Sequence, residues 1–584
     1  MLKFTAFCVA CFVFLLGHPS MSVAASDASA REQKVDFSGP HLIPVTLDIS
    51  LSGWRFATDD KPKAVILAFT PYSPQGLIDR AVFFASHDYV FLVVSSRGRG
   101  DSEGTFQPFS AADVADTAKV IQWAAAQPWS DGQVAMWGGS YVGYSQWAAL
   151  AQLLAPLKTI APAAAVYPGV DFPAYNNIRF NYSFQWLQAL QGRGDWFSLA
   201  FRDAIWTERV VQLRRQGLPT TSLTKYTGSN NVIARQWLNH PTLDSYWQQA
   251  VPTDTALQQT RLPVLTITGY FDADQRGALA HHQRYISAGN EQRQNATLLL
   301  GPWDHAGTRT PTLQQAGIMV EPNSVLDLNA LHLSWYDWVL KQKIQPPSLR
   351  SGIHYFLMGT NEWRYLSQMP EADVAWHLHP RSDNSFSAIS PGLLSTADGP
   401  AAEFSYTYQP QQAALTNPVA LTQQANEQRD VKAINGDGLV FVSELFTESM
   451  DLVGAPKLQL NISVNAVDTD IHVLLEEIMA DGETLRLSFD MQRLRHRDGL
   501  NKSALLQPGR LYPVSFDSFT FIGKRIARGS RLRLSLHSNP PLYLEHNFTG
   551  PEDVSLQTAQ NTNTIDVTII QTEQQPNILW LPIK

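Results

Sequence analysis

Short hydrophobic runs alternate with amphipathic segments between residues 35 and 165. Two of these runs, Ala64–Phe69 and Tyr89–Val94, are continuously apolar, as is typical of parallel strands that are covered on both faces. From Val114 to Ile121, mostly apolar positions recur at i, i+3, i+4 and i+7, which predicts the buried face of a helix. Strands and helices that alternate in this way predict an α/β fold with a doubly wound parallel sheet.

A second pattern replaces the first between residues 166 and 255. Strand-like runs disappear, and tryptophans stand in a polar, helical background, which predicts a helical cap inserted into the α/β domain. The alternation resumes from residue 256 to 345, with apolar runs at Val264–Thr268 and Thr297–Leu300 and a closing helix over Leu326–Gln342. The tryptophans of the predicted cap are Trp186, Trp196, Trp206, Trp237 and Trp247.

The remaining residues, 346–584, have the pattern of an all-β domain. Apolar and polar residues alternate strictly over Leu458–Val464 and Arg531–Leu536, as expected for strands with one buried face. Glycines and prolines separate many such segments, which predicts a β-sandwich of the jelly-roll kind for this C-terminal region.

The first 25 residues have the composition of a secretory signal peptide. Lys3 precedes an apolar core, Phe4–Leu16, and small residues up to Ala25 fit the rule for cleavage before Ser26. The apolar core is short for a membrane span, although an uncleaved N-terminal anchor is an alternative. We therefore expect an exported protein, periplasmic or secreted.

Composition narrows the chemistry that the mature chain can carry. Both cysteines, Cys8 and Cys11, lie in the signal segment, so disulfides, thiolate zinc sites and cysteine nucleophiles are excluded after cleavage. Cys11 leaves lipoprotein processing as an alternative. The net charge is −8 and no basic block occurs, which argues against nucleic acid as a partner. The mature chain of roughly 560 residues is too long to fold around one hydrophobic core, and its length predicts about two to four domains.

Ser140 lies where an apolar run breaks into glycines, within residues 134–143. This pattern predicts a strand that ends in a sharp turn, with the serine hydroxyl lifted above the sheet and a helix beginning at about Tyr144. Glycines suit such a turn because it holds the serine in a strained conformation that bulky neighbours would obstruct.

A serine hydroxyl becomes a nucleophile when a histidine takes its proton and a carboxylate orients that histidine. Asp272 and His305 each follow an apolar strand, and ligand sites of α/β sheets form at these strand ends. The order Ser140, Asp272, His305 is that of the α/β-hydrolases. Asp274 is an alternative acid. No histidine pair stands at metal-ligand spacing beside a carboxylate motif, so neither a metal nor another cofactor is expected.

Several short runs resemble the family of cocaine esterases and X-Pro dipeptidyl-peptidases, and together they cover nearly the whole mature chain. The glycine spacing around the serine departs from the general G-x-S-x-G pattern and is typical of this family. The resemblance implies an α/β-hydrolase domain, a helical cap and a jelly-roll domain. The matching runs are Thr70–Tyr72, Arg97–Gly104, Gln127–Ser130, Gly138–Gly143, Gly269–Asp272, Gly301–His305, Met358–Gly359, Trp363–Arg364 and Phe441–Glu444.

The resemblance also implies roles for individual residues. Ser140 would be the nucleophile, His305 the general base and Asp272 the orienting acid. Tyr72 would donate its hydroxyl to the oxyanion beside the backbone N–H of Tyr141. In one departure, Ser95 stands where the family usually carries an aspartate.

These observations predict a serine hydrolase that cleaves ester or amide bonds of small acyl or peptidyl substrates, with no nucleic-acid partner and no stable membrane association after signal cleavage. An α-amino-acid ester hydrolase, an X-Pro dipeptidyl-peptidase and a catalytically dead binding or scaffold protein remain alternatives. Asp274 would bind a substrate ammonium or cap the helix through Ala278–Tyr285. Capping is favoured because Gln275, rather than a second carboxylate, follows Asp274.

Overall fold

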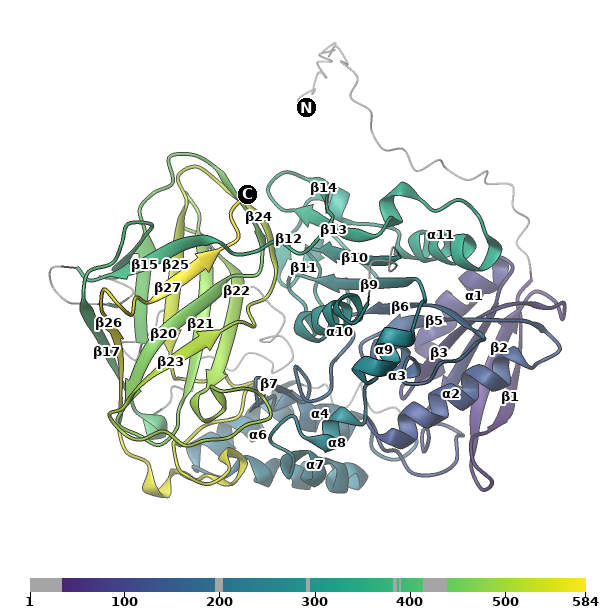
Figure 1. The fold of residues 1–584 in the computed structure, drawn as a ribbon. Coiled ribbons are helices and arrows are strands. Elements are labelled where there is room, and N and C mark those ends of the chain that lie inside the picture. Colours follow the sequence, from purple (N-terminus) through teal and green to yellow (C-terminus); the bar gives the residue numbers. More distant parts are fainter. Residues whose placement is uncertain (1–33, 195–202, 290–294, 382–385, 388–389, 413–437) are drawn as a thin grey trace, which may run out of the picture. The chain divides into compact units, whose positions relative to one another are not determined.

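The computed structural model describes residues 34–194, 203–289, 295–381, 386–387, 390–412 and 438–584 (Figure 1). The predicted signal segment, residues 1–25, lies outside the described residues. Residues 35–584 belong to a single unit of the structure.

A ten-stranded sheet forms the first part of this unit, in the order β1-β2-β4-β3-β5-β6-β9-β10-β13-β14 (Figure 1). Its seven central strands are parallel, whereas β1, β2 and β14 are antiparallel to their neighbours. The apolar runs predicted as buried strands are confirmed as β3, β4, β9 and β10. The strands are β1 (Asp36–Pro44), β2 (Ser50–Ala57), β3 (Lys63–Thr70), β4 (Val90–Ser95), β5 (Ser130–Gly139), β6 (Leu157–Ala163), β9 (Val264–Gly269), β10 (Ala296–Gly301), β13 (Gly352–Leu357) and β14 (Glu362–Leu366).

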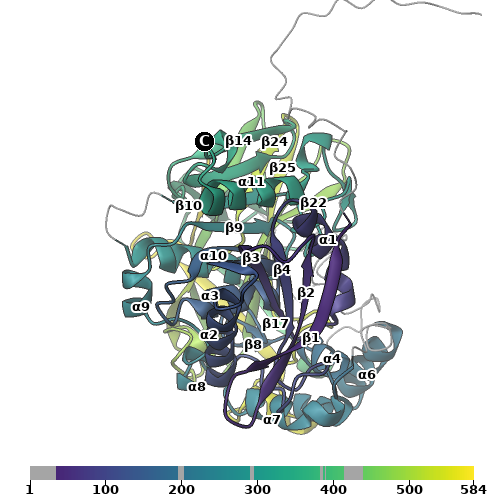
Figure 2. The same ribbon diagram turned by 90° about the vertical axis from the view of Figure 1, so that its right-hand side faces the viewer.

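Helices cover both faces of this sheet (Figures 1 and 2). On one face, α1 (Ile78–Ser86) and α11 (Leu328–Lys341) contribute Phe84, Trp335 and Tyr336 to a hydrophobic cluster. The other face packs against α2 (Ala111–Ala125), α3 (Tyr141–Ala149) and α10 (Gln275–Ser287). The doubly wound α/β-hydrolase sheet predicted from the sequence is thus confirmed.

Short helices fill the region predicted as a cap. Trp186, Trp237 and Trp247 are buried in one cluster with Phe109 of the α/β domain. Trp206 is buried in the same cluster, and Trp196 lies outside the described residues. The elements are β7 (Ala174–Tyr175), β8 (Ile178–Arg179), α4 (Tyr182–Ala189), α6 (Asp203–Arg215), η2 (Thr220–Tyr226), η3 (Gly228–Asn230), α7 (Asn231–Leu238), α8 (Ser245–Gln248) and α9 (Asp254–Gln259).

The C-terminal region is β-rich, as predicted. An eleven-stranded sheet encloses an apolar core, and a two-stranded sheet, β19–β24, lies beside it. The strands are β15 (Val374–His379), β16 (Gly392–Ser395), β17 (Ala402–Tyr408), β18 (Gly438–Ser443), β19 (Met450–Gly454), β20 (Lys457–Val464), β21 (Asp470–Ile478), β22 (Thr484–Arg493), β23 (Leu511–Phe516), β24 (Ile522–Ile526), β25 (Arg531–His537), β26 (Ile565–Gln571) and β27 (Ile578–Leu581).

The end of the α/β sheet differs from the boundary at residues 345/346 expected from the pattern. Strand β13 pairs in parallel with β10, and β14 pairs with β13, so the sheet extends to Leu366. Hydrophobic alternation identifies a strand but does not say which sheet the strand joins, so the pattern did not show that β13 and β14 belong to the α/β sheet.

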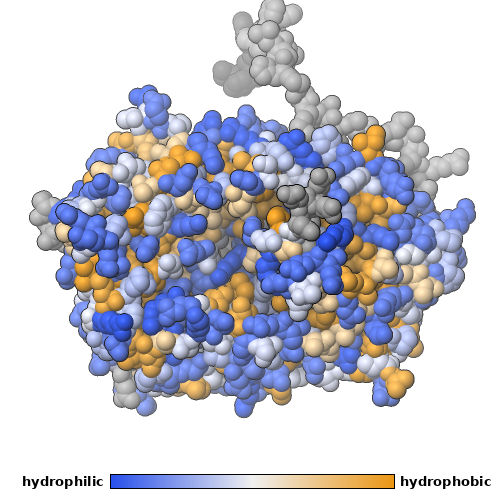
Figure 3. Space-filling model, in the orientation of Figure 1, coloured by the Kyte–Doolittle hydropathy of each residue, from blue (hydrophilic) through white to orange (hydrophobic). Residues whose placement is uncertain are grey.

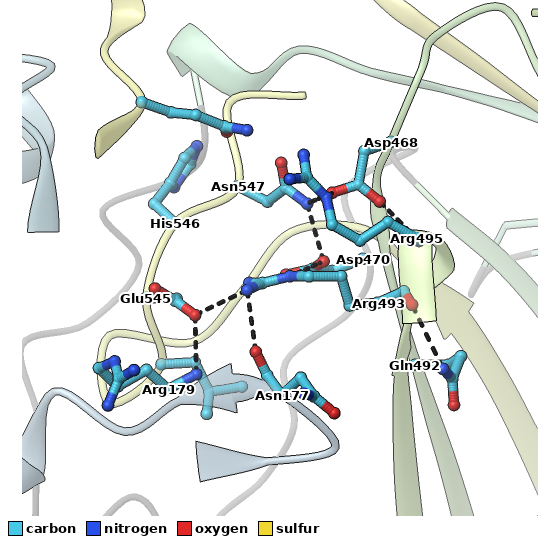
Figure 4. A network of polar contacts seen from close by, with 12 residues as sticks. Asn177, Arg179, Asp468, Asp470, Gln492, Arg493, Arg495, Glu545, His546 and Asn547 are labelled. Atoms are coloured by element: carbon cyan, nitrogen blue, oxygen red, sulfur yellow. Dashed lines mark hydrogen bonds and ion pairs between the residues drawn. The ribbon is translucent and has the colours of Figure 1, made fainter. Parts of the chain in front are cut away.

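A buried ionic network joins the β7–β8 hairpin to the C-terminal domain (Figure 4). Arg493 pairs with Asp470 at 2.9 Å and with Glu545 at 2.8 Å, and it also donates to the carbonyl oxygen of Asn177 at 2.9 Å. Glu545 accepts a further hydrogen bond from the backbone N–H of Arg179 at 2.9 Å. The charges of Arg493, Asp470 and Glu545 are thus all paired, as buried charges require.

The surface carries no dominant hydrophobic face in the view of Figure 3, where hydrophilic residues surround smaller hydrophobic patches. Large exposed hydrophobic side chains such as Phe37, Leu47 and Val232 come from separate elements. Within the described ranges, no helix has both the length and the apolar character needed to cross a membrane.

Candidate active site

Ser140 forms the turn between strand β5 and helix α3. Its φ is 60° and its ψ is −125°, a conformation that a non-glycine residue adopts only at an energetic cost. The backbone N–H of Ser140 donates to the carbonyl oxygen of Ala163 at 2.9 Å, and its own carbonyl accepts from Tyr144 at 2.9 Å. These bonds hold the strained turn and present the serine at the carboxyl end of β5.

Two glycines permit this turn. A Cβ on Gly138 would lie 2.2 Å from Cγ1 of Val142, and one on Gly139 would lie 2.2 Å from Nη1 of Arg309. Neither position can therefore carry a side chain without displacing a neighbour. The helix begins at Tyr141, three residues earlier than the pattern predicted, because the turn consists of a single residue.

His305 and Asp272 are brought together by neighbouring strands. They follow β10 and β9, which pair in parallel up to their last residues, so the two side chains meet at one edge of the sheet. Nδ1 of His305 lies 2.9 Å from Oδ1 of Asp272. Asp272 is buried, whereas the His305 side chain is 30% exposed, so the imidazole remains accessible from the site.

The charges around His305 favour its protonated form. Burial alone would lower the pKa of His305, but Asp272 and, more weakly, Asp274 raise it above the ordinary value. A base that is readily protonated and held by a carboxylate suits the transfer of a serine proton.

Tyr72 lies at the Ser140 hydroxyl. Burial raises the pKa of the Tyr72 phenol, whereas hydrogen bonds from Trp186 and Ser140 lower it. The indole N–H of Trp186, which belongs to cap helix α4, donates to Oη of Tyr72 at 3.2 Å. The cap therefore fixes the orientation of the phenol beside the serine.

Tyr141 offers its backbone rather than its side chain to the site. It is the first residue of α3, where backbone N–H groups lack intrahelical acceptors. Its phenol points elsewhere and donates to Oδ2 of Asp113 at 2.5 Å. Burial raises the pKa of Asp113 to about 7, and the hydrogen bond from Tyr141 opposes that rise.

Asp274 also faces the histidine. Its Oδ2 lies 3.4 Å from Nδ1 of His305, farther than the closest oxygen of Asp272, so Asp272 is the better placed acid. Asp274 occupies the N-cap position of α10, but its side chain makes no capping hydrogen bond. The interpretation of Asp274 as a side-chain cap is therefore wrong. Burial, followed by the neighbouring carboxylates, raises its pKa well above the ordinary value.

A different residue, Asp171, caps helix α10. Its two carboxyl oxygens accept hydrogen bonds from the backbone N–H groups of Tyr167 at 2.8 Å and Gly277 at 2.5 Å. Burial raises the pKa of Asp171 to about 8, despite these bonds. No local pattern indicates this role, because 106 residues separate Asp171 from Gly277.

Asp272, Asp274 and His305 could also hold a cation, since their ligand atoms lie within 4.8 Å of one another. The short contact between Asp272 and the histidine Nδ1, however, occupies the nitrogen that such an ion would need. Their arrangement suits proton transfer better than metal binding.

Comparison with known proteins identifies the family. Residues 27–307 match the family described as X-Pro dipeptidyl-peptidase (S15 family), and residues 349–579 match the X-Pro dipeptidyl-peptidase C-terminal non-catalytic domain. The chain is 25% identical to the cocaine esterase of Rhodococcus sp. (strain MB1 Bresler) over 543 residues, which cover 87% of this chain and 92% of the esterase. The chain belongs to the cocaine-esterase and X-Pro dipeptidyl-peptidase family.

Solved structures share the whole fold of this family member. An aminopeptidase from the marine sediment archaeon Thaumarchaeota archaeon matches with a TM-score of 0.79, 18% identity and coverage of 98% of this chain and 100% of the other. An α-amino acid ester hydrolase matches with a TM-score of 0.80, 18% identity and coverage of 97% and 100%. Family membership makes the chain a hydrolase of the serine peptidase and esterase kind.

In this member of the family, the C-terminal domain contacts the loop that carries the acid. Oε1 of the buried Gln275 accepts from the backbone N–H of Phe521 at 2.7 Å, and its Nε2 donates to the carbonyl oxygen of Gly269 at 3.0 Å. The ring of Phe521 also stacks on Tyr270, with centroids 6.1 Å apart. The residue after Asp274 must both donate and accept here, which an amide does and a carboxylate does not.

Proposed function

We propose that this chain is a serine hydrolase that cleaves ester or amide bonds of small acyl or peptidyl substrates through an acyl-enzyme. Ser140 is the nucleophile, His305 the general base and Asp272 the orienting acid. The observation that carries the proposal is the 2.9 Å contact between His305 and Asp272, at the same sheet edge as the strained turn of Ser140.

In the first half of the reaction, Oγ of Ser140 attacks the substrate carbonyl carbon while Nε2 of His305 takes the hydroxyl proton. Asp272 holds Nδ1–H and stabilises the imidazolium that forms. The carbonyl oxygen gains negative charge and accepts hydrogen bonds from the Tyr72 hydroxyl and the Tyr141 N–H, each typically worth about 3 kcal/mol. His305 then returns the proton to the leaving alcohol or amine.

The second half repeats these steps with water. His305 removes a proton from the water that attacks the acyl-enzyme, and the oxyanion forms again beside Tyr72. As the intermediate collapses, His305 returns that proton to Oγ of Ser140, and the acid is released. The same donors serve both tetrahedral intermediates, so one geometry accounts for acylation and deacylation.

Covalent labelling tests this proposal. A fluorophosphonate probe should label the chain at Ser140, and Ser140→Ala should abolish the label while the circular dichroism spectrum is unchanged. A folded wild-type protein that takes no label and hydrolyses neither p-nitrophenyl esters nor aminoacyl-arylamides would instead support the binding or scaffold alternative.

A second candidate is a hydrolase of substrates with a free amino group. Asp274 favours it, because its buried carboxyl makes no capping bond and stands beside the catalytic histidine, where a substrate ammonium could pair with it. The solved aminopeptidase and α-amino acid ester hydrolase that share the fold bear names consistent with such a substrate.

Export is a further part of the proposal, resting on the composition of residues 1–25. The protein recovered from outside the cytoplasm should begin at Ser26, as N-terminal sequencing would determine. Recovery of the chain with an intact N-terminus from the cytoplasm alone would contradict export.

A further inference from the structure

A cationic side chain lies directly against the turn that carries the proposed nucleophile. Arg309 follows His305 by four residues, and its Nη1 and Cδ would lie 2.2 Å and 2.7 Å from a Cβ on Gly139. The guanidinium therefore packs on the backbone of the residue that precedes Ser140. A side chain at position 139 would occupy the space that the arginine now fills and would displace it.

The hydrogen bonding of Arg309 does not resemble that of a structural arginine. Its guanidinium donates to Oγ1 of Thr308 over a long 3.4 Å. Among the residues that the structure describes, no carboxylate oxygen lies within 4.0 Å of it, whereas Arg493 and Arg495 each have close carboxylate partners. Partial burial without a close ion pair is unfavourable for a cation, so keeping Arg309 at this position has an energetic cost.

The positive charge of Arg309 acts on the groups that the proposed mechanism uses. Burial lowers the pKa of Arg309, and its interactions with Asp272, Tyr72 and Asp274 oppose that effect. In return, the guanidinium lowers the pKa of His305, and it partly offsets the rise in the pKa of Tyr72 that burial and Asp274 cause. A phenol with a lower pKa is a stronger hydrogen-bond donor, and a positive potential at this place favours the charge that develops on the substrate carbonyl oxygen.

We propose that Arg309 is a positioning residue of the oxyanion site, which rests on the proposed function: its guanidinium, seated on Gly139, supports the Ser140 turn and places a positive charge beside the groups that react. Arg309 forms no bond to the substrate in this scheme. The glycine preceding the serine and the arginine after the histidine then form one functional pair, although 170 positions separate them in the sequence.

Three variants separate charge from packing. Arg309→Gln removes the charge, and Arg309→Lys keeps it. Arg284→Gln removes a partly buried arginine of α10 that pairs with Asp254 rather than with a residue of the proposed site. Steady-state kcat and KM on a p-nitrophenyl ester, measured from pH 5 to 9, give the readout. Thermal unfolding of each variant checks that it folds.

We expect Arg309→Gln to lower kcat by about 10-fold to 100-fold with little change in KM. This decrease in kcat is smaller than the one expected when a direct hydrogen-bond donor to the oxyanion is lost. The charged groups facing His305 are Asp272, Asp274 and Arg309. Because Arg309 lowers the pKa of His305, the glutamine variant should also move the acidic limb of kcat/KM to higher pH. Arg309→Lys should keep the limb in place, and Arg284→Gln should match the wild type.

The inference is overturned if Arg309→Gln has wild-type kcat and an unmoved limb. It is equally overturned if the lysine and glutamine variants lose activity alike with no shift of the limb, since only packing would then matter. The proposed function fails differently: in that case the wild-type Ser140 takes no fluorophosphonate label, whatever stands at position 309.

Discussion

Replacing Asp274 with asparagine tests which substrates the site accepts. The substitution keeps the size of the side chain and removes its negative charge, 3.4 Å from Nδ1 of His305. Because Asp274 makes no side-chain cap to α10, we expect the free energy of unfolding to change little. A lost N-cap would instead lower it by about 1 kcal/mol.

The expected effect on catalysis depends on the substrate. A charge-assisted hydrogen bond between Asp274 and a substrate ammonium contributes roughly 1.5–3 kcal/mol. Asp274→Asn should therefore lower kcat/KM on substrates with a free amino group by about 10-fold to 150-fold. The N-acetylated forms of the same substrates carry no ammonium and should be nearly unaffected.

The assay compares matched pairs of aminoacyl and N-acetyl-aminoacyl p-nitrophenyl esters across pH. Burial and neighbouring carboxylates raise the pKa of Asp274, so its carboxylate forms only as the pH rises. The wild-type preference for free amino substrates should accordingly increase with pH until the substrate amine itself loses its proton. Asp274 also raises the pKa of His305, so the two enzymes are compared on the plateau above the acidic limb.

Equal losses on both substrate sets would refute recognition of an amine by Asp274. If the unfolding midpoint also falls while kcat/KM decreases equally on both substrate sets, the role of Asp274 is structural. Unchanged kinetics on both sets would show that the substrate ammonium, if present, is bound elsewhere.

Three further outcomes are expected. Ser140→Ala and His305→Ala should each lower kcat by several orders of magnitude, and the double variant should be barely worse than either, because the residues act as a unit; additive losses would contradict their roles. Tyr72→Phe should lower kcat on the order of 10²–10³-fold with little change in KM, and a change in KM alone would make Tyr72 a packing residue. Asp171→Asn should destabilise the fold in urea titrations, by an amount that shrinks between about pH 4 and pH 8. Its native pKa, about 8, lies above the unfolded value, so the wild-type protein loses stability as the pH rises through this window and the variant does not; a constant difference would refute the raised pKa.

Local patterns in the sequence predicted the parts of the site that depend on local structure. The glycines around Ser140 indicated the turn because only that backbone requires them, and the apolar runs before Asp272 and His305 indicated strands whose ends meet. The α/β class and the β-rich C-terminal region followed from residue periodicity for the same reason.

Local sequence patterns could not predict contacts between segments that are distant in the sequence. The side chain of Asp274 was expected at the helix N-terminus, but Asp171, from the cap region, occupies that place. Nothing around Arg309 forms a motif, since its role depends on Gly139 lying beneath it. Likewise, strand β13 joins the α/β sheet because it pairs with β10, and the residues of β13 alone do not indicate this.

The hydrogen bond between Gln275 and Phe521 has a consequence for the order in which the protein is made. These residues are 246 positions apart, so at about 5–20 residues per second the ribosome adds Phe521 roughly 12 to 50 seconds after Gln275. During that interval, the loop bearing Asp272 lacks the backbone donor that holds its neighbouring glutamine. The backbone N–H that holds Gln275, next to Asp274, is therefore supplied only by the last third of the chain.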